Sequence, residues 1–487
     1  MLRLFSLGLA LAAHAAGGNS QPNNQWSNAA RRDVEAGYQL FRDNHPGWED
    51  KTNSGFRAQL ERARKLGLAA ASMAKDEAGY EDALGGFSAA LSDGHARLIA
   101  TDSDPNAAPR WPGFTTAWRG QRLLVAEASP TSPAPIGAEI VRCGGKPIRQ
   151  FITARLEARG MRPSEAGQWW SKSARALIDS SDASGPPPSE CLFRVGSQTN
   201  QRQLQWTPAP SDLPDRLKRA SDGERTPIGL HEPRPGLFLI GLPDFDPDEA
   251  GRAAYRQMFG ELEAKRESLR RAKAIIIDLR YNDGGADEWS LETAKALWGR
   301  GSVEAARADS QKAVQIRWRA SPGNIAYVNQ LTTRLRQQGS LQTADEIGKA
   351  AQAMQLALSV GHPFASDSDN EHPVAAIKQA SHFTTPVYVI VPGRCASACL
   401  DAVDTFKLFP NTKLIGAPTS ADSQYLEIRT EPLPSGHGIA IIPTKVWMYR
   451  PRKSGQVYRP DVEATQLDWS TKAFLDLVER TLLKGGS

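Results

Sequence analysis

Apolar residues in the first hundred positions recur at intervals of three and four, which is the spacing of an amphipathic helix. The repeat is clearest at Val34, Tyr38 and Phe41, at Phe56, Leu60 and Ala63, and at Tyr80, Leu84, Phe87 and Leu91. His45-Pro46-Gly47 interrupts it with residues that commonly end a helix, and we expect His45 to be a packing residue there. The pattern predicts a helical N-terminal domain over residues 25–105.

The pattern changes in residues 112–207, where short runs of strand-forming residues alternate with turn residues. Leu123-Leu124-Val125-Ala126, Glu139-Ile140-Val141-Arg142 and Leu192-Phe193-Arg194-Val195 are typical of strands, and Gly144-Gly145 is typical of a tight turn. This segment therefore predicts a β-rich module. Six prolines between positions 207 and 235 indicate a linker after it.

Strands and helices alternate in residues 229–480. The runs at 274–279 and 387–391 are apolar at almost every position, as in strands that are covered on both faces. Helical patterns at 248–272 and 399–406 accompany them, so we expect an α/β domain with a largely parallel sheet. Residues from about 290 to 382 are helical and polar, which is typical of an insertion.

The first 16 residues have the features of a signal peptide. Arg3 is basic, residues 4–13 are almost wholly apolar, and Ala13-His14-Ala15-Ala16 ends in small residues. We therefore expect a periplasmic or secreted protein. Elsewhere the sequence has no uninterrupted apolar stretch long enough to span a bilayer, so we expect no stable membrane insertion.

Charge and cysteine content exclude some functions. The formal net charge of +5 comes from 59 basic and 54 acidic residues among 487, without a basic block, which argues against a nucleic-acid partner.

Cys143 and Cys191 could form a disulfide in an oxidising compartment, whereas Cys395 and Cys399 are awkwardly spaced if both lie in a regular helix. No CxxC pair appears and no histidine lies near a cysteine, so a zinc site is improbable. We expect neither a metal nor an organic cofactor.

Two strand ends carry residues that are suited to catalysis. Asp278-Leu279-Arg280-Tyr281-Asn282-Asp283-Gly284-Gly285 closes the isoleucine-rich strand, and its glycines could present free N–H groups, although a plain turn is the alternative. Arg394-Cys395-Ala396-Ser397-Ala398-Cys399 follows the valine-rich strand, and Ser397 lies where a helix begins. Ser397 is therefore a candidate nucleophile, with a simple helix cap as the alternative.

These segments, in this order, resemble the C-terminal processing and tricorn-type serine peptidases. The resemblance includes the Asp-Leu-Arg-x-Asn-x-Gly-Gly strand end, the Ala-Ser-Ala helix start, and three later motifs, Gly416-Ala-Pro-Thr419, Leu433-Pro-Ser-Gly436 and Pro460-Asp461-Val462. Asn44-His45-Pro46-Gly47 and Asp93-Gly94-His95 resemble the bacterial branch, and residues 112–205 are similar to the PDZ-like domain of the family. The resemblance implies a crotonase-like α/β catalytic domain, a helical N-terminal domain and a PDZ-like β module.

The resemblance also assigns roles to particular residues. It makes Ser397 the nucleophile and the N–H groups of Ala398 and of Gly284 or Gly285 the oxyanion hole. The lysine base of the processing branch has no counterpart after Gly416-Ala-Pro-Thr419, so His95 becomes the candidate base, as in the tricorn branch.

The acid that would support His95 is less obvious, because the place of the family glutamate reads Lys453-Ser454-Gly455-Gln456-Val457. Asp422 and Glu427 are the nearest substitutes in sequence, and we select Asp422. Arg450-Pro451-Arg452 is expected in a solvated loop.

The sequence therefore predicts a serine peptidase that cleaves exported proteins or peptides through an acyl-enzyme on Ser397. Two alternatives remain open: a weakly active or inactive binding protein on the same scaffold, and a hydrolase of small esters. The sequence leaves the oligomeric state open.

Overall fold

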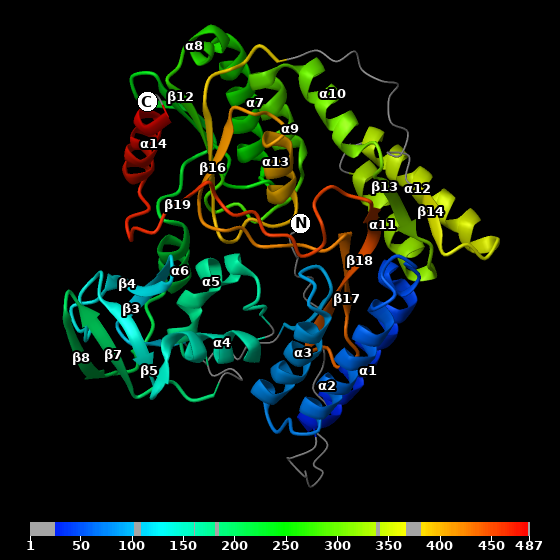
Figure 1. Ribbon diagram of the computed structural model, residues 1–487. Coiled ribbons are helices and arrows are strands. Elements are labelled where there is room, and N and C mark those ends of the chain that lie inside the picture. Colours follow the sequence, from blue (N-terminus) through cyan, green and yellow to red (C-terminus); the bar gives the residue numbers. More distant parts are fainter. Residues whose placement is uncertain are drawn as a thin grey trace.

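The apolar runs of residues 229–480 lie side by side in one six-stranded sheet (Figure 1). The computed structural model describes residues 25–101, 109–159, 161–180, 185–337, 341–366 and 381–485, so the predicted signal peptide lies outside the described residues. The strand order is β10-β11-β12-β15-β16-β19, and every neighbouring pair except β10 and β11 is parallel. The strands are β10 (Gly229–Arg234), β11 (Leu237–Gly241), β12 (Ala274–Asp278), β15 (Val387–Val391), β16 (Thr412–Gly416) and β19 (Val462–Glu463).

Alternate side chains of the central strands enter two different cores, which explains why these strands are apolar at every position. One face packs against helices α7 (Glu249–Ala264), α9 (Glu288–Trp298) and α13 (Ala398–Phe406), and the short α8 (Arg266–Arg270) follows α7. The other face packs against α14 (Thr471–Gly485) and against tryptophans of the β-rich module that precedes the α/β segment. The strands predicted at 274–279 and 387–391 and the helix predicted at 399–406 are confirmed.

Residues 25–100 form three helices and one strand. The helices α1 (Gln25–Asn44), α2 (Phe56–Ala71) and α3 (Glu77–Leu91) pack on one another through the predicted apolar positions. Strand β1 (Arg97–Ala100) then joins a second sheet of order β1-β18-β13-β14, with β17 paired to β18. The other strands of this sheet are β13 (Gln315–Arg319), β14 (Phe364–Ser366), β17 (Tyr425–Pro432) and β18 (Gly438–Met448). This sheet connects the N-terminal helices to the end of the α/β segment.

The region expected to be a helical insertion also contains strands. It holds most of α9, α10 (Arg300–Gln311), α11 (Pro322–Gln337) and α12 (Leu341–Ser359), together with β13 and β14. Strand β13 pairs with β18, and α9 covers the central sheet, so parts of this region belong to the main body of the protein. None of the described helices combines the length and apolar character needed to cross a bilayer.

Residues 110–222 form an antiparallel sheet with accompanying helices. Its strands are β3 (Phe114–Arg119), β4 (Arg122–Ala128), β5 (Glu139–Cys143), β7 (Glu190–Val195) and β8 (Gln198–Gln203), with β6 (Lys146–Pro147) paired to β5. The Cys143–Cys191 disulfide joins β5 to β7. The shorter elements are α4 (Ile148–Ala158), α5 (Ala166–Lys172), α6 (Leu213–Asp222) and the pair β2 (Arg110–Trp111) and β9 (Thr207–Pro208).

Helix α5 brings this β module against the central sheet. A Cβ atom at Gly167 would collide with the backbone of Gly393 and of Thr419 and Ser420. These residues lie on the two loops that follow β15 and β16. The module therefore packs directly on loops at the carboxyl ends of the parallel strands, the edge where active sites of α/β proteins are found.

Candidate active site

Ser397 occupies a strained turn between β15 and α13. Its φ is 53° and its ψ is −129°, a conformation that residues with a Cβ atom rarely adopt. Its side chain makes no capping hydrogen bond, although it precedes the first residue of α13. The simple cap considered from the sequence is therefore not what the structure contains. Strained, half-buried residues at element junctions often belong to functional sites.

A disulfide closes the five-residue loop around Ser397. Cys395 and Cys399 are bonded, with their Cα atoms 5.2 Å apart, and both side chains are fully buried. The expected difficulty of this bond does not arise because α13 begins at Ala398, so Cys395 precedes the regular helix. The bond fixes the two ends of the segment that carries Ser397.

The Gly284-Gly285 turn lies directly against this loop. A Cβ atom at Gly284 would be 2.9 Å from Ser397 Cβ and from the Ala396 carbonyl oxygen, and 3.4 Å from the Ala398 nitrogen. Both glycines have positive φ, 119° and 131°, so only glycine permits this approach.

The N–H groups of this turn differ in their availability. Gly284 N–H donates to Asn282 Oδ1 at 3.0 Å, and Asn282 in turn donates to the Leu242 carbonyl at 2.8 Å. Within the described residues, the N–H groups of Gly285 and Ala398 have no acceptor. Of the two glycines named from the sequence, Gly285 therefore has the free donor, and Gly284 provides the close contact.

His95 lies on the turn between α3 and β1. Its backbone N–H donates to Asp93 Oδ1 at 2.8 Å, and Ser92 ends α3 in a left-handed conformation. The paired strands β1 and β18 hold the end of this turn in place. His95 Nδ1 is buried and has no hydrogen-bond partner among the described residues.

Asp422 lies on the loop between β16 and β17 and is buried. Burial raises the pKa of its carboxyl group, while the positive charges of Arg452 and His95 lower it. Asp422 Oδ1 accepts a hydrogen bond from Arg452, and Oδ2 is buried without a partner in the described part of the chain. His95 and Asp422 are thus close enough to influence each other electrostatically, and each has one unsatisfied buried atom.

Glu427, the other acid considered from the sequence, has different surroundings. It is exposed on β17, and its carboxylate lies 3.8 Å from Lys445 Nζ. An exposed glutamate paired with a lysine contributes little to a buried site. The structure therefore favours Asp422 of the two.

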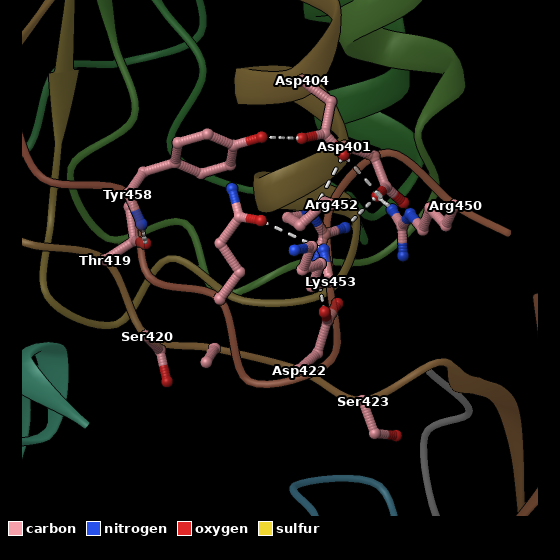
Figure 2. Close-up of polar contacts among 12 residues, drawn as sticks. Asp401, Asp404, Thr419, Ser420, Asp422, Ser423, Arg450, Arg452, Lys453 and Tyr458 are labelled. Carbon is pink, nitrogen blue, oxygen red and sulfur yellow. Dashed lines mark hydrogen bonds and ion pairs between the residues drawn. The ribbon is translucent and has the colours of Figure 1, made fainter. Parts of the chain in front are cut away.

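The expected solvated loop at Arg450-Pro451-Arg452 is wrong, because both arginine side chains are buried in a charged cluster (Figure 2). Arg452 contacts Asp401, Asp404 and Asp422, whereas Arg450 contacts Asp401 and Asp404. Asp401 and Asp404 lie one turn apart in the otherwise apolar α13, and that spacing is the signal from which a buried basic partner could have been inferred.

Residues 237–463 match the family model described as peptidase family S41. The match spans β11 to β19 and includes the glycine turn, the Ser397 loop and Asp422. With the α/β fold, it defines the chain as a serine peptidase, a hydrolase of peptide bonds. The match covers slightly less than half of the chain, and it confirms the resemblance to the C-terminal processing and tricorn-type peptidases.

Solved structures of CPAF share a fold with nearly the whole chain. Mature CPAF is 12% identical, with a TM-score of 0.64 over 95% of this chain and 99% of CPAF. Mature CPAF complexed with lactacystin is also 12% identical, with a TM-score of 0.62 over 94% of this chain and 98% of CPAF. No curated protein matches the chain. At 12% identity, the structural likeness shows only that the two proteins share a fold. The shared fold covers more of the chain than residues 237–463, which match the family model.

Proposed function

We propose that the chain cleaves peptide bonds with a Ser397–His95–Asp422 triad. The observation that carries the proposal is the contact of the Gly284-Gly285 turn with the strained Ser397 loop, which supports an oxyanion site next to the Ser397 hydroxyl. Peptide substrates follow from the family match, and no organic cofactor or metal is needed for this chemistry.

The proposed reaction begins when Ser397 Oγ attacks the substrate carbonyl carbon and His95 takes the hydroxyl proton. The N–H groups of Ala398 and Gly285 donate to the developing oxyanion, and each donor is worth roughly 3 kcal/mol. His95 then protonates the leaving amine, which gives an acyl-enzyme. Water, deprotonated by His95, attacks the ester, and collapse of the intermediate returns the proton to Ser397.

Asp422 is proposed to orient His95 and to stabilise its charged form. We assign His95 Nδ1 to Asp422 Oδ2, because both atoms are buried and neither has a hydrogen-bond partner among the described residues. That assignment leaves His95 Nε2 for the serine proton. A carboxylate in this position stabilises the imidazolium without taking its proton.

The rest of the predicted organisation is part of the proposal. We infer a crotonase-like α/β catalytic domain over 229–480, a helical N-terminal domain over 25–105 and a PDZ-like module over 112–207 that presents substrate.

The apolar N-terminal segment and the two disulfides support a periplasmic or secreted location and an exported substrate. The close packing of α5 on the catalytic loops supports communication between the PDZ-like module and the active site.

The test is hydrolysis of fluorescently labelled casein and of p-nitrophenyl acetate by the wild-type protein and by single variants. We expect casein cleavage to be lost in Ser397→Ala and to fall by about 10³-fold or more in His95→Ala. Ser359→Ala, at the exposed end of α12, is the control for replacing a serine outside the site. Turnover of the ester without casein cleavage would favour a small-ester hydrolase, and a folded protein that turns over neither would favour a binding protein.

A further inference from the structure

We propose that Arg452 is a positioning residue that holds Asp422 against the helix carrying the nucleophile. The proposal rests on the catalytic triad proposed above and adds a residue from outside it. Arg452 makes no hydrogen bond or ion pair with Ser397 or His95 in the described structure, so its effect on catalysis would act through Asp422.

The guanidinium of Arg452 joins three carboxylates (Figure 2). Nη1 donates to Asp422 Oδ1, Nη2 lies 2.6 Å from Asp401 Oδ1, and Nε lies 2.9 Å from Asp404 Oδ2. The Arg452 side chain is only 1% exposed, so water does not compete for these bonds.

Two of those carboxylates belong to the nucleophile helix. Asp401 and Asp404 lie on α13, which begins directly after Ser397, and the Asp401 N–H donates to the Ser397 carbonyl at 3.2 Å. A displacement of Arg452 would therefore change the position of Asp422 relative to α13 and Ser397. Arg452 thus joins Asp422, on the loop after β16, directly to two residues of the nucleophile helix.

Only arginine has the donors for this arrangement. Its planar group presents several N–H donors in fixed directions, whereas a lysine ammonium is a compact point charge on a flexible stem. Tyr458 donates to Asp404 Oδ1, and Arg450 donates to Asp401 Oδ1, the oxygen that Arg452 also uses. A lysine at 452 would preserve the positive charge but not the three-way connection.

Arg452 also affects the ionisation of Asp422. Burial favours the neutral carboxyl, Arg452 and His95 favour the carboxylate, and the negative charge of Asp404 opposes it. Without Arg452, the pKa of Asp422 rises further, and the group stays protonated to higher pH. A neutral Asp422 would no longer stabilise a charged imidazolium.

Arg450 provides a matched control. Its side chain is 8% exposed and contacts Asp401 and Asp404, the same two helix residues, but the structure gives it no contact with Asp422. Replacing Arg450 therefore removes a buried positive charge from the same cluster while leaving the bond to Asp422 in place. If Arg452 acted only on stability, replacing either arginine should change the catalytic rate to the same extent.

The experiment measures the rate of labelling by a fluorophosphonate probe from about pH 5 to about pH 9. The proteins are the wild type, Arg452→Gln, Arg452→Lys and Arg450→Gln, each checked for folding by thermal melting. We expect Arg452→Gln to lose roughly 10²-fold in rate at neutral pH, with the acidic limb of its profile moved to higher pH. Arg450→Gln should stay within about threefold of wild type and keep its pH profile.

The lysine variant separates charge from geometry. Arg452→Lys should label about tenfold more slowly than wild type while its acidic limb stays in place, because the charge is kept and the connection is lost. If Arg452→Gln does not fold, Arg452→Lys alone tests the proposal, and labelling like wild type at every pH would overturn it. Equal losses in Arg452→Gln and Arg450→Gln with an unshifted profile would also overturn it. A wild-type protein that does not label would instead refute the proposed triad.

Discussion

Replacement of Gly284 by alanine tests whether the glycine turn is part of the catalytic apparatus. The new Cβ atom would lie 2.9 Å from both Ser397 Cβ and the Ala396 carbonyl oxygen, a separation that real Cβ atoms essentially never show. Both neighbours belong to the loop that the Cys395–Cys399 disulfide closes, so the strain must move either this loop or the glycine turn. Either movement separates the nucleophile from the proposed oxyanion donors.

Two separate estimates give the range of the expected loss in rate. Misplacement of a reacting group by about 1 Å costs roughly 10²-fold in rate, and loss of one oxyanion donor costs about 10² to 10³-fold. The positive φ of 119° at Gly284 adds a stability cost of about 1 to 3 kcal/mol for alanine. We therefore expect Gly284→Ala to remain folded, to melt a few degrees lower, and to react with a fluorophosphonate probe about 10² to 10³-fold more slowly.

A second glycine separates backbone strain from the active-site contact. Gly137 also has positive φ, 86°, but a Cβ atom there would meet nothing within 4 Å. Gly137→Ala should therefore lose stability and keep its labelling rate. If Gly284→Ala labels as fast as wild type, the turn has no part in catalysis and the reasoning about the oxyanion site is refuted.

Further predictions concern stability and the nucleophile loop. Burial lowers the pKa of His45 to about 4, so the neutral imidazole stabilises the fold fully above about pH 6.5. As the pH falls towards 4, the free energy of unfolding should decrease by about 3 kcal/mol. Urea unfolding should show this decrease in the wild type and a smaller one in His45→Asn. Arg280→Met removes the ion-pair partner of the buried Asp278 and should lower the free energy of unfolding by about 3 to 5 kcal/mol in the same assay. A decrease below about 1 kcal/mol would contradict a stabilising role of this ion pair. Replacing Cys395 and Cys399 with serine should slow labelling of Ser397 by about tenfold, because the strained loop is no longer closed, while removal of the other disulfide should not.

The parallel sheet could be predicted from the sequence because its signal is local. Strands β12 and β15 are covered on both faces, so each is a continuous apolar run, and the chemistry-bearing residues follow those runs directly. For the same reason the sequence alone marks the Ser397 loop and the glycine turn as candidate sites. The structure adds that they touch.

The second sheet could not be predicted in this way. It combines β1 from the N-terminal region, β13 and β14 from the supposed insertion, and β17 and β18 from the end of the chain. Most of its strands are short or only partly buried, and pairing between segments that are far apart in the sequence leaves no local pattern. This sheet positions the turn that bears His95, so the sequence indicates the base only through the family resemblance.

The buried arginines show another limit of local patterns. Arg450 and Arg452 flank a proline in a polar stretch, which is the composition of an exposed loop. Their burial depends on Asp401, Asp404 and Asp422, which are distant in sequence and compensate the charges.

The central claim, that Ser397 is an activated nucleophile, is tested most directly by locating the adduct of a fluorophosphonate probe in the intact protein. Labelled protein would be digested and its peptides analysed by mass spectrometry, with Ser397→Ala and heat-unfolded protein as controls. The account predicts one modified residue, Ser397, and no labelling in either control. Modification of another serine, or equal labelling of Ser397→Ala, would contradict it.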